Sequence, residues 1–342
     1  MRGKQIGKQK GSQNHRFNFR VVLAALLITL LLPLSHAVAA AKPQQGPGNG
    51  LRISPVRTDA TVQPGHSQTI NLSVTNVTGA AASFQAIIND FVASPDESGN
   101  PSIIIDPTKF APSHSLKRYV GPVSVVTLQP GEEKNVPIVV TIPANAAGGG
   151  YYGAVRFAPA SPAAPNSQLS LSGSVGSLIL VKVPGNIKEQ VSIAGIDVIS
   201  GKHHGNFFTS SKDLNVSLRF QNAGNIQEAP FGKLLVKNRS NKTVGTYELN
   251  NIVPPGNVLP DSIRRFVVPI KTGGFGEYKI EGNFGYGSAG QLLSVATTIY
   301  IIPLPVIVAF IVVVVVLAVA IFGIPRLIKV YNRRVLRRAG RR

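Results

Sequence analysis

The sequence predicts an all-β protein of two tandem immunoglobulin-like β-sandwiches, with an apolar segment near each end of the chain. Three observations predict this fold class. Short stretches that alternate apolar and polar residues recur between turn signals, as expected for half-buried strands. No convincing helical period occurs outside the two apolar segments. A loose internal repeat divides the strand-rich part into two halves, each of a size that suits one core.

The first apolar segment predicts a secretory signal peptide over residues 1–39. Six basic residues and no acid occupy the first twenty positions, and the 14-residue apolar run Val21–Leu34 follows them. Ala37-Val38-Ala39 is a small-x-small site that places cleavage before Ala40, with Ala39-Ala40-Ala41 a close second. An uncleaved signal anchor is the alternative, although the run is short for a span of about 20 residues. Residues 40–50, rich in Pro, Gly and Gln, predict a flexible leader.

The second apolar segment predicts a transmembrane helix over residues 304–324. These 21 residues carry no charge, and at a rise of about 1.5 Å per residue they cross a hydrocarbon core of about 30 Å. Residues 325–342 hold eight basic residues and no acid, so the positive-inside rule predicts a cytoplasmic basic tail. We therefore expect a single-pass type I protein of the cell membrane, with most of the chain extracellular.

The net charge of +20 reflects mainly these two ends. Fourteen of the 35 basic residues lie in them, which leaves 21 basic against 15 acidic residues elsewhere. The basicity therefore indicates membrane topology and phospholipid contact, and no nucleic-acid partner is expected. The chain has no cysteine, so an exported protein of this kind must fold on its apolar cores, which favours a bacterial cell-surface protein.

Three segments illustrate the strand pattern, because each alternates apolar and polar residues with a period of two: Ile70–Asn76, Val136–Ile142 and Leu214–Phe220. The repeat is clearest between Ile70–Gly79 and Leu214–Gly224, where an alternating strand is followed by Asn and a turn that ends in Gly. Gln-Pro-Gly or Pro-Pro-Gly turns precede several strands. We place the first sandwich at 51–183 and the second at 187–298.

Three motifs resemble cofactor-binding or metal-binding sites, but the residues around each favour a structural role. Gly148–Gly153 matches G-x-G-x-x-G, but a strand-like segment follows where a dinucleotide site needs a helix, so it predicts a tight turn before a strand. His203-His204 would point to opposite faces of a strand and predicts a solvated loop rather than a metal site. Asp96–Asn100 lacks the ligand spacing of an EF-hand and predicts a hairpin turn with solvated carboxylates.

No catalytic motif is present in the sequence, so it predicts a non-enzyme without cofactor or metal. Aromatic-rich stretches are the candidate binding surfaces, and core packing is the alternative role of every side chain in them. The six candidate surface-binding residues are Tyr151, Tyr152, Phe207, Phe208, Phe284 and Tyr286.

Residues 128–157 carry a family resemblance. Leu128-Gln-Pro-Gly131 is followed by an alternating strand, a Pro-x-x-Ala segment beginning at Pro143, and the glycine run that leads into Gly153-Ala-Val155. This order is similar to the end of the peptidoglycan-binding domain of WxL-interacting proteins. Val74-Thr-Asn76 and Asp96–Gly99 also resemble a strand-Asn and an acidic-Gly turn of that domain, so the resemblance covers about residues 51–160. The overall plan resembles that family too, with a signal peptide, two immunoglobulin-like domains, one C-terminal helix and a short basic tail.

The resemblance implies that the first domain binds cell-wall peptidoglycan or another surface glycan, and that the second binds another surface protein. The leading hypothesis is thus a non-catalytic adhesion or scaffold protein. The alternative is an accessory subunit of a membrane export or sensing complex that acts through its helix and tail. A third, an enzyme on a sandwich scaffold, would need a polar cleft that the sequence does not reveal.

Overall fold

The computed structural model describes residues 50–160 and 175–339, with side chains as far as Arg333. The predicted signal peptide, nearly all of the leader and most of the proline-rich stretch after Pro159 lie outside the described residues. Among the described residues, strands dominate as far as Ile301 and helix follows from Leu304.

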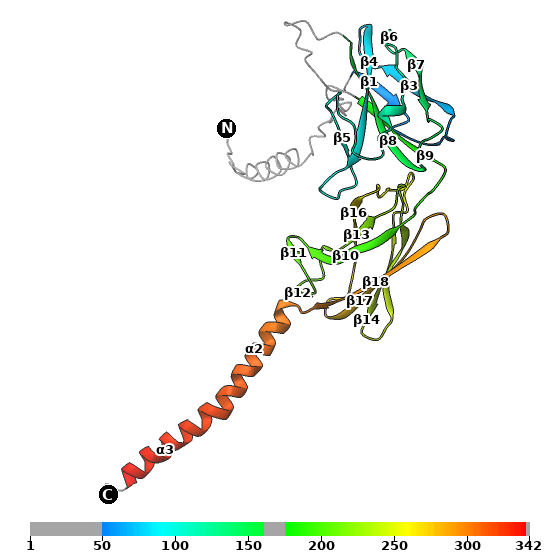
Figure 1. Cartoon of the computed structure of the whole chain (residues 1–342). Coiled ribbons are helices and arrows are strands. Elements are labelled where there is room, and N and C mark those ends of the chain that lie inside the picture. Colours follow the sequence, from blue (N-terminus) through cyan, green and yellow to red (C-terminus); the bar gives the residue numbers. More distant parts are fainter. Residues whose placement is uncertain (1–49, 161–174, 340–342) are drawn as a thin grey trace, which may run out of the picture. The chain divides into compact units, whose positions relative to one another are not determined.

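The first group of strands forms two facing sheets (Figure 1). A three-stranded sheet has the order β1-β3-β7, and a larger sheet has the order β2-β9-β8-β4-β5, with β6 paired to β4. Apolar side chains from both sheets share one core, including Leu72, Ile138, Phe157 and Ile179, so this group is a β-sandwich. The strands are β1 Leu51–Ser54, β2 Arg57–Thr61, β3 Ser67–Asn76, β4 Ala82–Ala93, β5 Pro101–Ile103, β6 Val126–Leu128, β7 Glu133–Thr141, β8 Gly149–Pro159 and β9 Val175–Val183, with the short 3-10 helix η1 at Lys117–Tyr119.

The second group of strands repeats this plan with a core of its own. A four-stranded sheet has the order β11-β10-β13-β16 and a five-stranded sheet the order β12-β18-β17-β14-β15. Leu218, Phe220, Leu234 and Phe284 are among the fully buried side chains between them. The strands are β10 Val191–Ser200, β11 His203–His204, β12 Phe207–Phe208, β13 Leu214–Asn222, β14 Phe231–Asn238, β15 Thr243–Leu249, β16 Ser262–Pro269, β17 Gly276–Tyr286 and β18 Gln291–Ile301.

The two sandwiches have the same strand order. The path β1-β3-β7 corresponds to β10-β13-β16, and β2-β9-β8-β4 corresponds to β12-β18-β17-β14. In both, the short strand β2 or β12 pairs in parallel with the last strand of its sandwich. Labelled in chain order, these are the A-B-E and G-F-C sheets of the immunoglobulin arrangement.

The predicted strands are confirmed, since Ile70–Asn76, Val136–Ile142 and Leu214–Phe220 fall in β3, β7 and β13. The repeat is also confirmed in position, because β3 and β13 are equivalent strands of the two sandwiches. The glycine run needs a correction. The tight turn lies earlier, at Ala144-Asn145, and Gly149 to Gly153 are already part of strand β8 between β4 and β9.

A long helix follows the second sandwich, running through α2 (Leu304–Ala318), the π-helical turn η2 (Val319–Gly323) and α3 (Ile324–Ala339). The stretch Leu304–Arg333 is long and apolar enough to cross a membrane, and no residue of α2 is buried by the rest of the structure. The helix does not end with the apolar run, because the basic tail continues it to Ala339. The π-helical turn ends at Gly323, two residues before Pro325, whose ring would collide with a carbonyl of the preceding turn in a regular α-helix.

Candidate functional site

The tip of the β4–β5 hairpin contacts the second sandwich. Glu97, at a left-handed φ of 61°, forms ion pairs with Arg219 and Arg265, and its carbonyl accepts a hydrogen bond from the Arg265 N–H at 2.8 Å. The Arg219 Nε donates to the Glu97 carboxylate at 2.7 Å, and this bond lowers the Glu97 pKa below its usual range. The predicted hairpin turn is confirmed, because β4 and β5 pair antiparallel on either side of it. The predicted solvated carboxylate is wrong for Glu97, because Arg219 of β13 and Arg265 of β16 bind it.

The glycine run forms a second contact between the two sandwiches, and we call the contacts between them the seam. The Gly150 N–H donates to the Asn225 carbonyl at 2.8 Å, and the Asn225 Nδ2 donates to the Gly148 carbonyl at 3.0 Å. A side chain at Gly149 would lie 2.8 Å from the Asn225 carbonyl, so only glycine fits here. These residues therefore bring the backbones of the two sandwiches together rather than binding a cofactor.

Tyr152 forms a third contact between the two sandwiches, and its side chain is buried. Its ring lies in a small apolar cluster with Phe91 and Leu180, against which Leu259 of the second sandwich packs. Its hydroxyl donates to the Gln227 Oε1 at 2.8 Å, and burial raises its pKa far above the usual range. Sequence reasoning missed this seam, because neither Glu97 nor Arg219 stands out in the chain from other charged residues.

The six candidate aromatic residues have different locations. Four are buried against the protein's own core, namely Tyr152, Phe208, Phe284 and Tyr286, so their rings do not form a binding surface. Tyr151 is half-buried and packs on Tyr119 at a ring distance of 5.3 Å. Phe207 alone is well exposed, at 64%, and it stacks on Tyr300 with ring centroids 5.2 Å apart.

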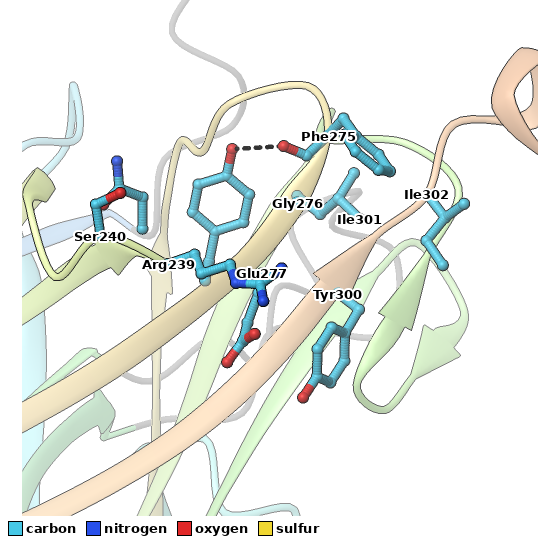
Figure 2. A pocket seen from close by; sticks show the side chains of 10 residues that line it. Arg239, Ser240, Phe275, Gly276, Glu277, Tyr300, Ile301 and Ile302 are labelled. Atoms are coloured by element: carbon cyan, nitrogen blue, oxygen red, sulfur yellow. Dashed lines mark hydrogen bonds between the residues drawn. The ribbon is translucent and has the colours of Figure 1, made fainter.

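A hollow of about 470 Å³, lined in part by Tyr300, lies at the end of β18 (Figure 2). Figure 2 shows Arg239, Phe275, Tyr300 and Ile302 around it, with the Tyr278 hydroxyl bonded to the Phe275 carbonyl at 3.4 Å. Phe275 is 63% exposed although it is a large apolar residue. Its position in a Gly-Gly-Phe-Gly loop was the sequence signal that could have found it, since such a loop cannot bury its one large side chain.

A second hollow, of about 430 Å³, lies at the opposite end of the same sheet, between β14, β15 and residues 250–255. Phe231 lines this hollow and belongs to a set of exposed apolar residues at this end of the sheet. We call this set the apolar rim and define it as Phe231, Ile252, Val253 and Leu292, exposed by 62%, 63%, 100% and 81%. Phe231 and Leu292 lie in one cross-strand row, because each pairs with Gly285. A patch of this kind on a soluble surface is typical of protein contact.

The first sandwich presents a different surface around Phe110. Its exposed ring lies 4.3 Å from the Arg118 guanidinium and 4.8 Å from the Lys117 Nζ. The buried Asp90 holds this loop in place, accepting hydrogen bonds from the Ala111 N–H, the Ser115 hydroxyl and the Lys117 N–H at 2.6–2.9 Å. The result is a basic and aromatic surface on a fixed loop, suited to an acidic ligand.

The histidine pair lies in the two-residue strand β11, where both side chains are exposed. The His204 ring contacts Asp197 at 2.8 Å, and the His203 ring contacts the Phe207 carbonyl at 2.8 Å. Among the described residues, no group of three or more His, Cys, Asp or Glu side chains is placed to hold a metal ion.

No family model matches this sequence, and no curated protein matches it either. Among solved structures, the chain is similar to a class 5 fimbriae chaperone, CfaA, with 13% identity, a TM-score of 0.38, and coverage of 74% of this chain and 100% of that one. It is also similar to the CsuC–CsuE chaperone–tip adhesion subunit complex of Acinetobacter baumannii, with 14% identity, a TM-score of 0.35, and coverage of 72% and 97%. TM-scores this low establish neither a shared function nor a shared partner.

Proposed function

We propose that this chain is a non-catalytic surface protein, anchored by its C-terminal helix, with two separately folding immunoglobulin-like domains that bind partners outside the membrane. The second sandwich binds another surface protein and the first binds peptidoglycan. The unburied helix Leu304–Arg333 supports the proposed anchor, and the basic residues from Arg326 onward favour a cytoplasmic tail and a type I orientation.

The observation that carries the protein-binding role is the apolar rim. Four large apolar side chains, one of them fully exposed, lie at one end of the sheet, and one of the four, Phe231, lines a hollow there. A soluble protein would normally place polar residues at such positions. The neighbouring strand β15 pairs only with β14 among the described strands, so its outer edge is open to strand addition. A protein partner can use both features at once, by burying the rim and pairing with the edge.

The peptidoglycan role is supported by the resemblance of residues 51–160 to the WxL-interacting family and by the Phe110 surface. Peptidoglycan offers sugar faces and carboxylates, which suit an aromatic ring flanked by two cations.

Both roles are tested by incubating the chain, kept in detergent, with two kinds of isolated cell wall and measuring how much protein sediments with each. One preparation keeps its surface proteins and the other is stripped of protein. The double variant Phe231→Ser, Leu292→Ser should lose the part of the binding that depends on wall proteins and keep binding to stripped walls. The double variant Phe110→Ala, Arg118→Ala should show the reverse.

Each variant is thus the control for the other. Equal losses for both variants on both preparations would contradict the assignment of one ligand to each sandwich. If the unchanged chain binds neither preparation, the surface-binding proposal is wrong, and an accessory role in a membrane export or sensing complex becomes the better account.

A further inference from the structure

A very short linker joins the second sandwich to the helix. Strand β18 ends at Ile301 and α2 begins at Leu304, so only Ile302 and Pro303 lie between them. The Ile302 N–H still donates to the Phe208 carbonyl at 2.8 Å, which ties the chain to the sandwich up to that residue. Two residues reach about 7 Å at most, while each polar layer of a bilayer is roughly 5–8 Å thick. The end of the sandwich nearest the helix therefore lies within the headgroup layer whenever α2 spans the bilayer.

The strand register identifies the loops at this end. Gly276 pairs with Ile301, and Asn238 pairs with Tyr278 next to them, so the loops 239–242 and 271–275 end beside the start of the helix. On the facing sheet, Ser200 pairs with both His203 and Leu214, which places 201–206 and 209–213 at the same end. We call these four segments the helix-proximal loops.

The helix-proximal loops are basic. They hold one acid, Asp213, and five exposed cations that form no ion pair among the described residues: Lys202, Lys212, Arg239, Lys242 and Lys271. The connecting segments at the opposite end (187–190, 223–230, 250–261 and 287–290) have the reverse balance, with Lys188 against Glu189, Glu228 and Asp261. Among the described residues, two further acids lie close to the basic end, namely Glu277 in the hollow of Figure 2 and Asp197, which contacts His204, so the five cations still outnumber the acids.

The same end exposes apolar and aromatic side chains. Phe207 and Phe275 are 64% and 63% exposed, and Tyr300 and Ile302 are 36% and 37% exposed. Aromatic rings beside unpaired cations are the residue types that favour the membrane–water interface, where the rings enter the acyl boundary and the cations meet phosphates.

We infer that the helix-proximal loops and the hollow of Figure 2 bind the headgroups of anionic phospholipids around the helix. This inference rests on the proposed anchoring by α2. Bound in this way, the second sandwich is held against the bilayer with its apolar rim at the far end of the sheet, turned toward partners.

The test uses the full-length chain, which contains no Trp, so that a single introduced Trp reports one position. Phe275→Trp is reconstituted into phosphatidylcholine vesicles with and without phosphatidylglycerol, and lipids spin-labelled near the headgroup serve as quenchers. We expect a blue-shifted emission and a loss of roughly half of it in anionic vesicles. Leu292→Trp, at the opposite end of the same sheet, should show neither change.

Removing two cations tests the electrostatic part. When Arg239→Gln and Lys271→Gln are added to Phe275→Trp, the Trp emission and its quenching should become the same in anionic and neutral vesicles. Flotation of the vesicles after alkaline washing reports the anchor separately. If the chain floats but Phe275→Trp is not quenched, or is quenched no more than Leu292→Trp, the headgroup inference is overturned and the anchor stands. If the chain does not float, the anchoring proposal fails and this inference fails with it.

Discussion

At the scale of single residues, two buried asparagines perform the same structural role in the two sandwiches. Asn76 and Asn222 end the equivalent strands β3 and β13, and both are fully buried. The Asn76 amide donates to the carbonyls of Ala80 and Leu128, and the Asn222 amide donates to those of Ile226 and Val258. In each, the side-chain oxygen accepts a backbone N–H two residues later, so each turn is fixed by one side chain.

Asn222→Ala should destabilise the second sandwich by about 3 kcal/mol, because two buried carbonyls and one N–H lose their partner at once. Urea unfolding of the full-length chain in detergent, followed by circular dichroism, measures the change. Asn283→Ala is the control, since Asn283 is exposed and its side chain bonds only the Ser294 hydroxyl among the described residues. Similar losses in the two variants would show that the buried network contributes little.

At the scale of elements, strand β8 belongs both to the core of the first sandwich and to the seam with the second. Its central residues, such as Val155 and Phe157, pack in the first sandwich, whereas its glycine-rich start meets the backbone of Asn225. The pattern of the sequence predicted a turn at these glycines, because glycine runs usually mark turns. The reason for glycine here is close approach of a second backbone, which depends on residues far along the chain.

Gly149→Ala should destabilise the chain by about 2 kcal/mol, since Gly149 has a φ of 151° and a Cβ there would meet the Asn225 carbonyl at 2.8 Å. Gly195→Ala, also in a strand, has open space around its Cβ and should leave stability nearly unchanged. Thermal unfolding of both variants tests the prediction, which would be wrong if the two substitutions had equal effects.

At the scale of the whole molecule, the two sandwiches are joined by more than the chain between Val183 and Val191. The hairpin tip with Glu97, the glycine run and the Tyr152 cluster all contribute contacts between them. The ion pair is the part of this seam that depends on pH. The folded Glu97 pKa lies below its ordinary value, so its contribution is complete above about pH 4.5 and is lost as the pH falls through the lowered pKa.

Glu97→Gln should therefore loosen the seam at neutral pH, and the unchanged chain should loosen only in acid. Because the chain has no cysteine, Gln68→Cys and Gln291→Cys allow one spin label in each sandwich, and the distribution of distances between the labels reports the seam. Asp96→Asn is the control, because Asp96 is exposed and its carboxylate bonds the Ser98 N–H within its own turn. A distribution that stays narrow in Glu97→Gln at neutral pH would contradict the prediction.

The sequence by itself determined the strand class, the positions of the main strands, the internal repeat and the apolar helix. These features depend on local periodicity, turn residues and length, which neighbouring residues carry. It did not determine which aromatic residues are exposed, because a Phe in a strand faces the core or solvent according to register, as Phe208 and Phe207 show.

Only the tertiary structure decided the seam and the surfaces. Glu97 and Arg219 are 122 residues apart, and the apolar rim gathers side chains from β14, β18 and a loop. The helix-proximal loops likewise share one end only because of the sheet register. Contacts of this kind depend on how distant segments pack, and the composition of any one segment does not predict that packing.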